Sequence, residues 1–472
     1  MVDNTVMTLT SAPSTSPTVT SEPYASVAER LRATYASGRT RSYEWRLEQL
    51  RALDRLLTER KQDIQRALGE DLRRTPFEAT LFDISATRGE VKHAIKHLAR
   101  WMKPRKVHAP VSVRPGRAWY QYEPLGVVLI IGPWNYPVHL TLTPLVAAFA
   151  AGNCAVIKPS EITPACSRLL ADLLPRYVDP DAVAVVEGGP EASLGLIDQA
   201  LDHCFFTGSP AIGSAVMAAA APNLTPVTLE LGGKSPAIVA SSADLEVTAR
   251  RIAFGKLVNS GQTCVAPDYI LVDRKVRDAF VDQLVSTVDR FSEGKPKPIV
   301  NSRHASRLAG LLQDHGGRVA LGGHIDVTDA TAEPTIVVDP WADSALMREE
   351  IFGPLLPVVS VDSVDEAVKR VQQGGRPLAT YLFTEDAADE QHVLEGISTG
   401  GTVVNHVMMH LAVSDLPFGG VGTSGMGRYH GHWGFETFSN VTAVVRKPSR
   451  PDPTFMYPPW SGLAQRVMNR LM

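Results

Sequence analysis

Residues 126–158 read GVVLIIGPWNYPVHLTLTPLVAAFAAGNCAVIK, and this stretch decides the fold class. The short apolar run Val127–Ile131 predicts a buried strand. Val138–Ala151 predicts a helix that stops at Gly152, because glycine readily adopts the left-handed conformation found at helix C-termini. A second apolar run precedes Lys158 and predicts another strand. Strand, crossover helix and strand together form one unit of a parallel sheet.

The alternation continues toward the C-terminus. We expect a helix near Pro164–Leu174, a strand at Ala182–Val186, a strand at His203–Phe206 and a helix at Ala211–Ala220. Such alternation predicts a parallel sheet covered by helices on both faces. In this architecture a dinucleotide most often binds across the carboxyl ends of the strands.

A second alternating region runs from about Val227 to about Pro417. Its expected strands are Ala237–Ala240, Tyr269–Val272, Thr335–Val338 and Thr380–Phe383, and its expected helices are Leu245–Val258, Val276–Phe291 and Val364–Gln373. Leucines recur at helical spacing through Val27–Arg105. Residues 107–122 alternate apolar and polar side chains around a Pro-Gly turn, which indicates an exposed hairpin. Phe418–Gly427 is glycine-rich without periodicity and predicts a structured loop.

Composition excludes several classes of protein. At roughly 150 residues per domain, a chain of 472 residues predicts about three structural units. Lysine and arginine number 47 against 50 acidic residues, a net charge of -3, without the dense basic cluster of a nucleic-acid binder. Four scattered cysteines make no disulfide framework, and no CxxC spacing suggests zinc. We therefore expect a cytoplasmic enzyme with neither a metal site nor a nucleic-acid partner.

The two ends of the chain differ from the rest. Met1–Pro23 is rich in Ser, Thr and Pro, so residues 1–25 are predicted to form a disordered tail rather than a signal peptide. No apolar run approaches the roughly 20 residues of a transmembrane segment. Trp460–Met472 predicts a short amphipathic helix. We expect it to pack on the protein or a partner subunit, since two arginines bind lipid weakly; weak membrane-surface contact is the alternative.

Two side chains suggest covalent chemistry. Cys264 lies in NSGQTC, a loop of small polar residues that can expose and activate a thiol, whereas the other cysteines have core surroundings. Glu230, in TLELGGKSP, has apolar neighbours, which raise the pKa of a carboxyl toward that of a general base. The alternative for Glu230 is an ordinary ion pair with Lys234.

Two further segments are candidates for binding. Two prolines fix the backbone around Asn135 in PWNYP, directly after a strand. Its carboxamide could donate to a developing oxyanion, or it could bond its own backbone in a structural turn. Gly208 and Gly213 match a phosphate-cradling turn only loosely. The motifs HxxEH, HExxH and GxSxG are absent, which argues weakly against the commonest metallopeptidases and hydrolases.

Seven ordered segments carry a resemblance: PWNYP, IKPSE, FTGSPAIG, LELGGKSP, GQTC, EEIFGP and PFGGVGTSGMG. In this order they resemble the aldehyde dehydrogenase superfamily from about Ser26 to Pro448. LTPVTLELGGKSP and the ending PFGGVGTSGMGRYHGHWGFETFS are most similar to the class-three branch, which oxidises aromatic and medium- to long-chain aliphatic aldehydes. The N-terminal extension departs from the short start of that branch but touches no catalytic motif.

The resemblance implies a role for each candidate. Cys264 would attack the aldehyde carbon as a thiolate, and the Asn135 amide with the Cys264 backbone N–H would hold the thiohemiacetal oxyanion. Hydride transfer to the nicotinamide would leave a thioester. Glu230 would activate water for its hydrolysis and help deprotonate Cys264. The substrate tunnel would be lined in part by Tyr136, Thr263 and His430.

The resemblance also implies NAD as the cofactor. Lys158 and Glu161 match family positions near the adenine ribose. Gly208, Ser209 and Gly213 match the pyrophosphate turn. Glu350 and Phe352 match the positions at the nicotinamide ribose. A carboxylate at the adenosine ribose prefers a 2′-hydroxyl to a 2′-phosphate, so Glu161 favours NAD. In this branch the same residue can swing aside, which leaves NADP open.

The implied fold class is α/β, with a Rossmann-like cofactor domain, an α/β catalytic domain and a small β element for bridging and oligomerisation. The expected parts are 26–105 with 123–229 for the cofactor, 230–417 for catalysis, 106–122 with 418–448 for bridging, and a C-terminal tail of 449–472. In this family the hairpin pairs with a neighbouring subunit, so we expect a homodimer.

Two other functions stay open. A CoA-acylating semialdehyde dehydrogenase would pass the acyl group to CoA instead of water. Glu230 argues against it, because hydrolysis needs a water-activating base. A non-catalytic binding or structural protein on the same fold would be expected to have lost one of the reactive groups, yet Cys264, Asn135 and Glu230 are all present.

Overall fold

A six-stranded sheet contains the strand–helix–strand unit expected at residues 126–158. The computed structural model describes residues 23–110, 113–452 and 457–471. The strands, in the order β18-β7-β6-β3-β4-β5, are Gly425–Met426, Val227–Leu231, His203–Gly208, Val127–Ile131, Cys154–Lys158 and Val183–Val185. All neighbours are parallel except β18, which runs antiparallel to β7. The carboxyl ends of β3, β4, β6 and β7 therefore share one edge.

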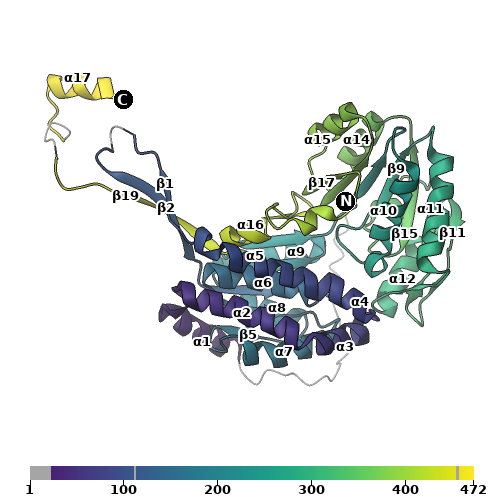
Figure 1. Cartoon of the computed structure of the whole chain (residues 1–472), viewed down its shortest axis with the longest axis horizontal. Helices are drawn as coiled ribbons and strands as arrows, with labels where there is room; N and C mark the ends of the chain where they lie inside the picture. The colour runs from purple at the N-terminus through teal and green to yellow at the C-terminus, as the bar shows by residue number, and fades with distance from the viewer. Residues whose placement is uncertain (1–22, 111–112, 453–456, 472) are drawn as a thin grey trace, which may run out of the picture.

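Helices cover both faces of this sheet and complete the six-stranded lobe (Figure 1). One of them, α6 (His139–Ala151), is buried along nearly its whole length, which explains why its sequence is apolar on all sides. It ends where expected, with Gly152 at a φ of 92°. The others are α1 (Tyr24–Ala36), η1 (Arg39–Arg41), α2 (Tyr43–Glu59), α3 (Lys61–Leu72), α4 (Pro76–Glu78), the π-helical η2 (Ala79–Ser85), α5 (Ala86–Trp101), α7 (Pro164–Tyr177), α8 (Pro190–Ile197), α9 (Pro210–Ala220), η3 (Ala221–Asn223) and α16 (Gly431–Thr437).

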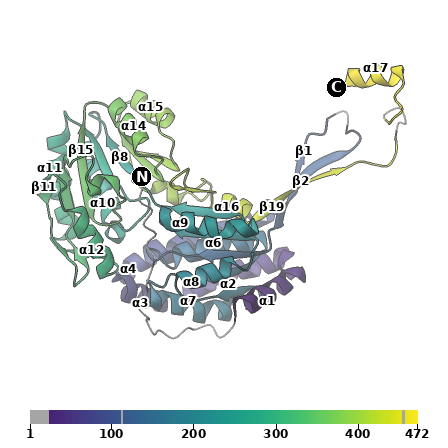
Figure 2. The ribbon, with the colours of Figure 1, turned by 180° about the vertical axis from the view of Figure 1, so that it is seen from behind.

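The seven-stranded lobe lies beside it (Figures 1 and 2). Its strands, in the order β11-β14-β15-β9-β8-β16-β17, are Arg318–Leu321, Thr335–Val338, Leu355–Val361, Tyr269–Asp273, Pro236–Val239, Ala379–Phe383 and Gly401–Val404, all parallel except β11. Its helices are α10 (Leu245–Leu257), η4 (Val258–Gly261), α11 (Arg277–Ser292), α12 (Ser302–Leu311), α13 (Ala345–Arg348), α14 (Val364–Gln373), α15 (Ala387–Gly396) and η5 (Met409–Ala412). A small sheet joins β10 (Lys297–Pro298), β13 (Thr331–Ala332) and β12 (Ile325–Asp326).

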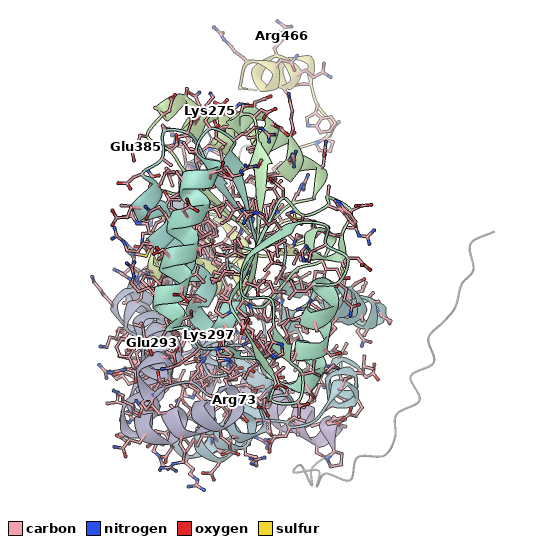
Figure 3. The ribbon with its side chains drawn as sticks, turned by 90° about the vertical axis from the view of Figure 1, so that its right-hand side faces the viewer. Arg73, Lys275, Glu293, Lys297, Glu385 and Arg466 are labelled. Carbon is pink, nitrogen blue, oxygen red and sulfur yellow. The ribbon has the colours of Figure 1, made fainter. Side chains whose placement is uncertain are left out.

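The two lobes are joined by polar contacts as well as by the chain. Arg73, labelled in Figure 3, follows α3 in the six-stranded lobe. Its guanidinium donates to the backbone oxygen of Asp329 in the other lobe at 2.8 Å.

A three-stranded antiparallel arm projects away from both lobes (Figures 1 and 2). Its order is β1-β2-β19, with bounds Arg105–Val107, Arg117–Pro124 and Ser439–Arg446. The first two strands form the expected hairpin. Beyond the arm lies α17 (Gly462–Leu471), the helix expected near the C-terminus; Arg466 marks it in Figure 3.

The structure confirms the α/β fold class and most of the expected elements. It adds several that were not expected, among them β15, β17, α12 and α15. The strand β15 lies between β14 and β9 although it contains Pro357, and a proline argues against a central strand because it cannot donate to the ladder. The predicted tail at 1–25 lies almost entirely outside the described residues. Within the described part of the chain, no helix combines the length and apolar character needed to cross a membrane.

Candidate active site

The loop that carries Cys264 leaves α10 through three consecutive left-handed residues. Asn259, Ser260 and Gly261 have φ values of 50°, 58° and 72°. A Cβ at Gly261 would lie 2.3 Å from the backbone oxygen of Gly353, so only glycine fits there. Non-glycine residues in this conformation cost about 1–3 kcal/mol each and cluster at functional sites. The loop is therefore held in a demanding conformation directly before the thiol.

Cys264 is the only one of the four cysteines that is partly exposed; the other three are buried, as expected, and all four are free. Burial, together with the neighbouring Glu350 and Glu230 carboxylates, raises the pKa of the Cys264 thiol to about 12. The backbone N–H groups of Cys264 and Val265 oppose that rise by stabilising negative charge on the sulfur. At neutral pH the Cys264 thiol is therefore protonated, and these two backbone N–H groups are directed at its sulfur.

Asn135 lies in the turn between β3 and α6 and is buried. Its side-chain amide donates to the backbone oxygen of Gln262 at 3.0 Å, rather than to its own backbone. Gln262 precedes Cys264 by two positions, so the amide lies against the loop that carries the thiol. A carboxamide has two N–H donors, and within the described part of the chain one of them remains for a further acceptor.

Glu230 is the penultimate residue of β7 and is 3% exposed. Neither carboxyl oxygen has a hydrogen-bond partner among the described residues. Burial raises the pKa of this carboxyl well above its usual value, and Arg428 partly opposes the rise. The alternative ion pair with Lys234 is wrong, because the Lys234 ammonium binds Asp268 and two backbone oxygens instead. A buried carboxyl without a fixed partner is free to exchange a proton.

The glycine-rich stretch 418–427 packs directly on β7 and covers Glu230. Gly425 pairs with Glu230 in the β18–β7 ladder. Gly425 has a φ of 135°, and a Cβ there would lie 2.0 Å from the backbone oxygen of Leu229. A Cβ at Gly419 would lie 2.9 Å from Glu230 Oε1. Side chains at these two positions would displace the loop from the carboxylate, which explains the glycines.

Two of the three expected substrate residues meet at the nucleophile loop. The hydroxyls of Tyr136 and Thr263 share a hydrogen bond of 2.7 Å, and Thr263 directly precedes Cys264. The third, His430, stacks its ring on Phe418 with centroids 5.2 Å apart. Burial lowers the pKa of His430 to about 4, so its ring is neutral at physiological pH.

The expected adenosine and pyrophosphate positions lie on the shared edge of the six-stranded sheet. Buried Lys158 ends β4 and binds the half-exposed Glu161 at 2.6 Å. Gly208 ends β6, and Ser209 precedes α9 without a side-chain hydrogen bond to the helix end. Gly213 lets α9 approach the sheet closely, since its Cβ would lie 2.5 Å from a Leu231 methyl.

The expected nicotinamide-ribose positions reach the site from the other lobe. A Cβ at Gly232 would lie 2.1 Å from Glu350 Oε2. Burial, with the Asp268 carboxylate, raises the pKa of Glu350 to about 8, while the Gly233 N–H donates to it and opposes the rise. Phe352 packs edge-to-face on Trp134, with centroids 5.3 Å apart.

These residues fit a dinucleotide. The uncapped N-terminus of α9 offers N–H groups and a positive dipole end, as a pyrophosphate requires. A carboxyl group lies at each end of the expected cofactor positions: Glu161 beside Lys158, and Glu350 near the thiol. No cluster of three or more His, Cys, Asp or Glu in the described ranges could hold a metal ion.

Three residues that hydrogen-bond to Asn135 were not expected from the sequence. Arg74 donates to the backbone oxygen of Asn135, and Asn259 donates to the same oxygen at 2.9 Å. Gln262 accepts from the Asn135 amide. Asn259 and Gln262 lie in the quoted motif, so two amides shortly before a candidate nucleophile were a usable signal. Arg74, 61 positions before Asn135, gave none.

The comparisons with known proteins agree with this geometry. A family model described as "Aldehyde dehydrogenase family" matches residues 11–444. The chain is similar to aldehyde dehydrogenase family 3 member B1 of Rattus norvegicus, at 44% identity over 448 residues, covering 93% of this chain and 95% of that protein.

Two solved structures extend the likeness to three dimensions. The substrate-bound state of Staphylococcus aureus AldH has a TM-score of 0.91 at 40% identity, covering 95% of this chain and 99% of that one. The NAD+ complex of an aldehyde dehydrogenase from Bacillus cereus has a TM-score of 0.83 at 28% identity, covering 90% and 88%. The chain therefore belongs to the aldehyde dehydrogenase family, and it is an NAD(P)-dependent enzyme that oxidises aldehydes to carboxylic acids.

Proposed function

We propose that this enzyme oxidises aromatic or medium- to long-chain aliphatic aldehydes through a covalent intermediate on Cys264. One observation carries the proposal: the hydrogen bond of 3.0 Å from the Asn135 amide to Gln262 holds an oxyanion donor against the loop of the thiol. The similarity to family 3 members supports the substrate class.

In the first step Glu230 accepts the thiol proton, and the Cys264 sulfur forms a bond to the aldehyde carbon. The carbonyl oxygen becomes an oxyanion, which accepts from the free N–H of the Asn135 amide and from the backbone N–H of Cys264. Removing one such donor typically costs about 10²–10³ in rate. Bound NAD(P) supplies the acceptor for the hydride that leaves the thiohemiacetal carbon, and a thioester on Cys264 results.

Glu230 then releases the thiol proton to solvent and is a carboxylate again. In the second step it accepts a proton from water, and the resulting hydroxide attacks the thioester carbon. The carbon–sulfur bond breaks, and the carboxylic acid leaves the regenerated cysteine. The raised pKa of Glu230 makes it a stronger base than an exposed carboxylate, and no described residue hydrogen-bonds to its oxygens. Hydrolysis rather than transfer to CoA follows from that carboxylate.

Residues of both lobes would hold the dinucleotide. Lys158 and Glu161 would bind the adenine ribose, the turn before α9 would bind the pyrophosphate, and Glu350 with Phe352 would position the nicotinamide ribose. The Glu161 carboxylate favours NAD, with NADP as the alternative. The six-stranded lobe is then the cofactor domain, the seven-stranded lobe the catalytic domain, and the arm the bridging element.

We further propose a cytoplasmic homodimer. Among the described residues, no strand pairs with the outer edge of β19, and Val441 and Val445 on this strand are 53% and 62% exposed. Exposed apolar side chains beside a free strand edge are typical of a surface that a second subunit covers.

The test is aldehyde-dependent reduction of NAD and of NADP, measured separately on a panel of aldehydes. Cys264→Ala should abolish reduction while leaving NAD binding in place. Cys204→Ala, which alters a buried cysteine of β6, is the matched control and should stay active. Normal turnover by Cys264→Ala would rule out the proposed nucleophile.

A further inference from the structure

Arg74 is a buried arginine that contacts both loops of the active site from behind. It lies between α3 and α4 and is 7% exposed. Its Nη2 donates to the backbone oxygen of Asn135 at 2.5 Å, and its Nε donates to the Asn259 side-chain oxygen at 3.2 Å. Its third nitrogen, Nη1, binds the fully buried Asp83. A single guanidinium therefore spans the turn that carries the oxyanion donor and the loop that carries the thiol.

Asp83 holds the other side of the same turn. While Oδ2 binds Arg74, Oδ1 accepts from the backbone N–H groups of Val138 and His139 at 3.3 and 3.0 Å. These N–H groups lie where α6 begins, directly after the turn. The carboxylate thus connects Arg74 to the start of α6, and the turn is clamped on both sides.

Asn135 is consequently fixed through both its backbone and its side chain. Its backbone oxygen accepts from Arg74 and from Asn259, and its amide donates to Gln262. The Arg74 guanidinium also lies 4.4 Å from the centre of the Tyr136 ring, the next residue in the turn. Arg74 makes no contact with the Cys264 side chain, so its effect on the reaction must act through the turn of Asn135 or through the loop of Cys264.

We propose that Arg74, held by Asp83, is a positioning residue that aims the Asn135 amide at the oxyanion. The inference rests on the proposed function of Asn135 and adds the group that sets its direction. Oxyanion stabilisation depends on the donor being preorganised, and a displacement of about 1 Å can cost roughly 100-fold in rate. Only an arginine presents donors in three directions from one rigid plane, which this site uses to bind three acceptors.

The first test compares Arg74→Met and Arg74→Lys with wild type in single-turnover oxidation of benzaldehyde. Without the Arg74 hydrogen bonds the Asn135 amide should lose its fixed orientation, and the rate of acylation in Arg74→Met should fall about 100-fold. Arg74→Lys should recover part of the loss, because an ammonium can still reach the Asn135 oxygen. Two readouts that form no oxyanion, alkylation of Cys264 by iodoacetamide and the Kd for NAD, should stay within about twofold of wild type.

The second test asks whether Arg74 acts through Asn135. Asn135→Ala removes the donor itself, so adding Arg74→Met to it should cause no further loss of acylation rate. A general structural role would instead make the two losses multiply. Arg46→Met is the matched control: Arg46 is also a buried arginine of the six-stranded lobe, and it binds the backbone oxygen of Ala150 at 3.1 Å, far along α6 from the turn.

The outcomes separate cleanly. Selective loss in Arg74→Met, non-additivity with Asn135→Ala and normal acylation in Arg46→Met support the inference. Unchanged acylation in Arg74→Met, multiplying losses, or an equal loss in Arg46→Met overturns it. If Cys264→Ala is inactive in the same assay while Arg74→Met is normal, the proposed function stands and only the inference fails.

Discussion

Replacing Gly232 with alanine should displace the carboxylate of Glu350 without disturbing the fold around it. The added Cβ would lie 2.1 Å from Oε2 and 2.5 Å from Oε1, whereas ordinary contacts begin at 3.4 Å. The carboxylate must therefore retreat by about 1.3 Å, the difference between 2.1 and 3.4 Å. Because the group that must move is the far end of a side chain, the protein should stay folded.

That retreat sets the size of the expected defect. Glu350 is proposed to orient the nicotinamide ribose, and a misplacement near 1 Å can cost about 100-fold in rate. We expect kcat/KM for NAD to fall by about that factor in Gly232→Ala. Steady-state kinetics with NAD as the varied substrate measures it, and thermal unfolding checks that the variant is folded.

Gly233→Ala is the adjacent control. Its Cβ would meet nothing closer than 3.5 Å, and its backbone N–H would still donate to Glu350. This variant should keep kcat/KM for NAD near that of wild type. A folded Gly232→Ala enzyme with unchanged kcat/KM would refute the placement of Glu350 at the ribose.

Three other predictions follow from the same site and from the arm. Glu230→Gln should slow deacylation far more than acylation, visible as a burst of NADH followed by a slow steady state; equal slowing of both would contradict its role as base toward water. With a pKa near 12, Cys264 should alkylate about tenfold faster per pH unit up to pH 10, since only thiolate reacts; a plateau below pH 9 would disagree. The double variant Val441→Asp/Val445→Asp should be a monomer in light scattering, and a dimer would contradict the proposed interface on the arm.

The parts of the fold that the sequence predicted are those whose signals are local. The unit β3–α6–β4 is contiguous, and Gly152 marks the end of its helix within a single turn. By contrast, β15 contains Pro357 yet is central, because its pairing with β14 and β9 outweighs the loss of one donor. Tertiary pairing of this kind leaves no trace in the spacing of residues along one strand.

The same distinction holds for the site. Cys264, Asn135 and Glu230 stand in short motifs that suggested their chemistry. The alternative ion pair between Glu230 and Lys234 was wrong. Lys234 binds Asp268 instead, which lies 34 positions away and comes close only because β8 and β9 are neighbours in the sheet. The contact of Arg74 with Asn135 depends in the same way on how the N-terminal helices pack.

The central claim is that the acyl group passes through a covalent bond to one sulfur atom. Rapid mixing of Glu230→Gln with benzaldehyde and NAD, acid quenching and peptide mass spectrometry would detect that bond. The account predicts a benzoyl adduct on the peptide that contains Cys264, formed only when NAD is present. An active enzyme that shows no adduct, or an adduct on another residue, would contradict it.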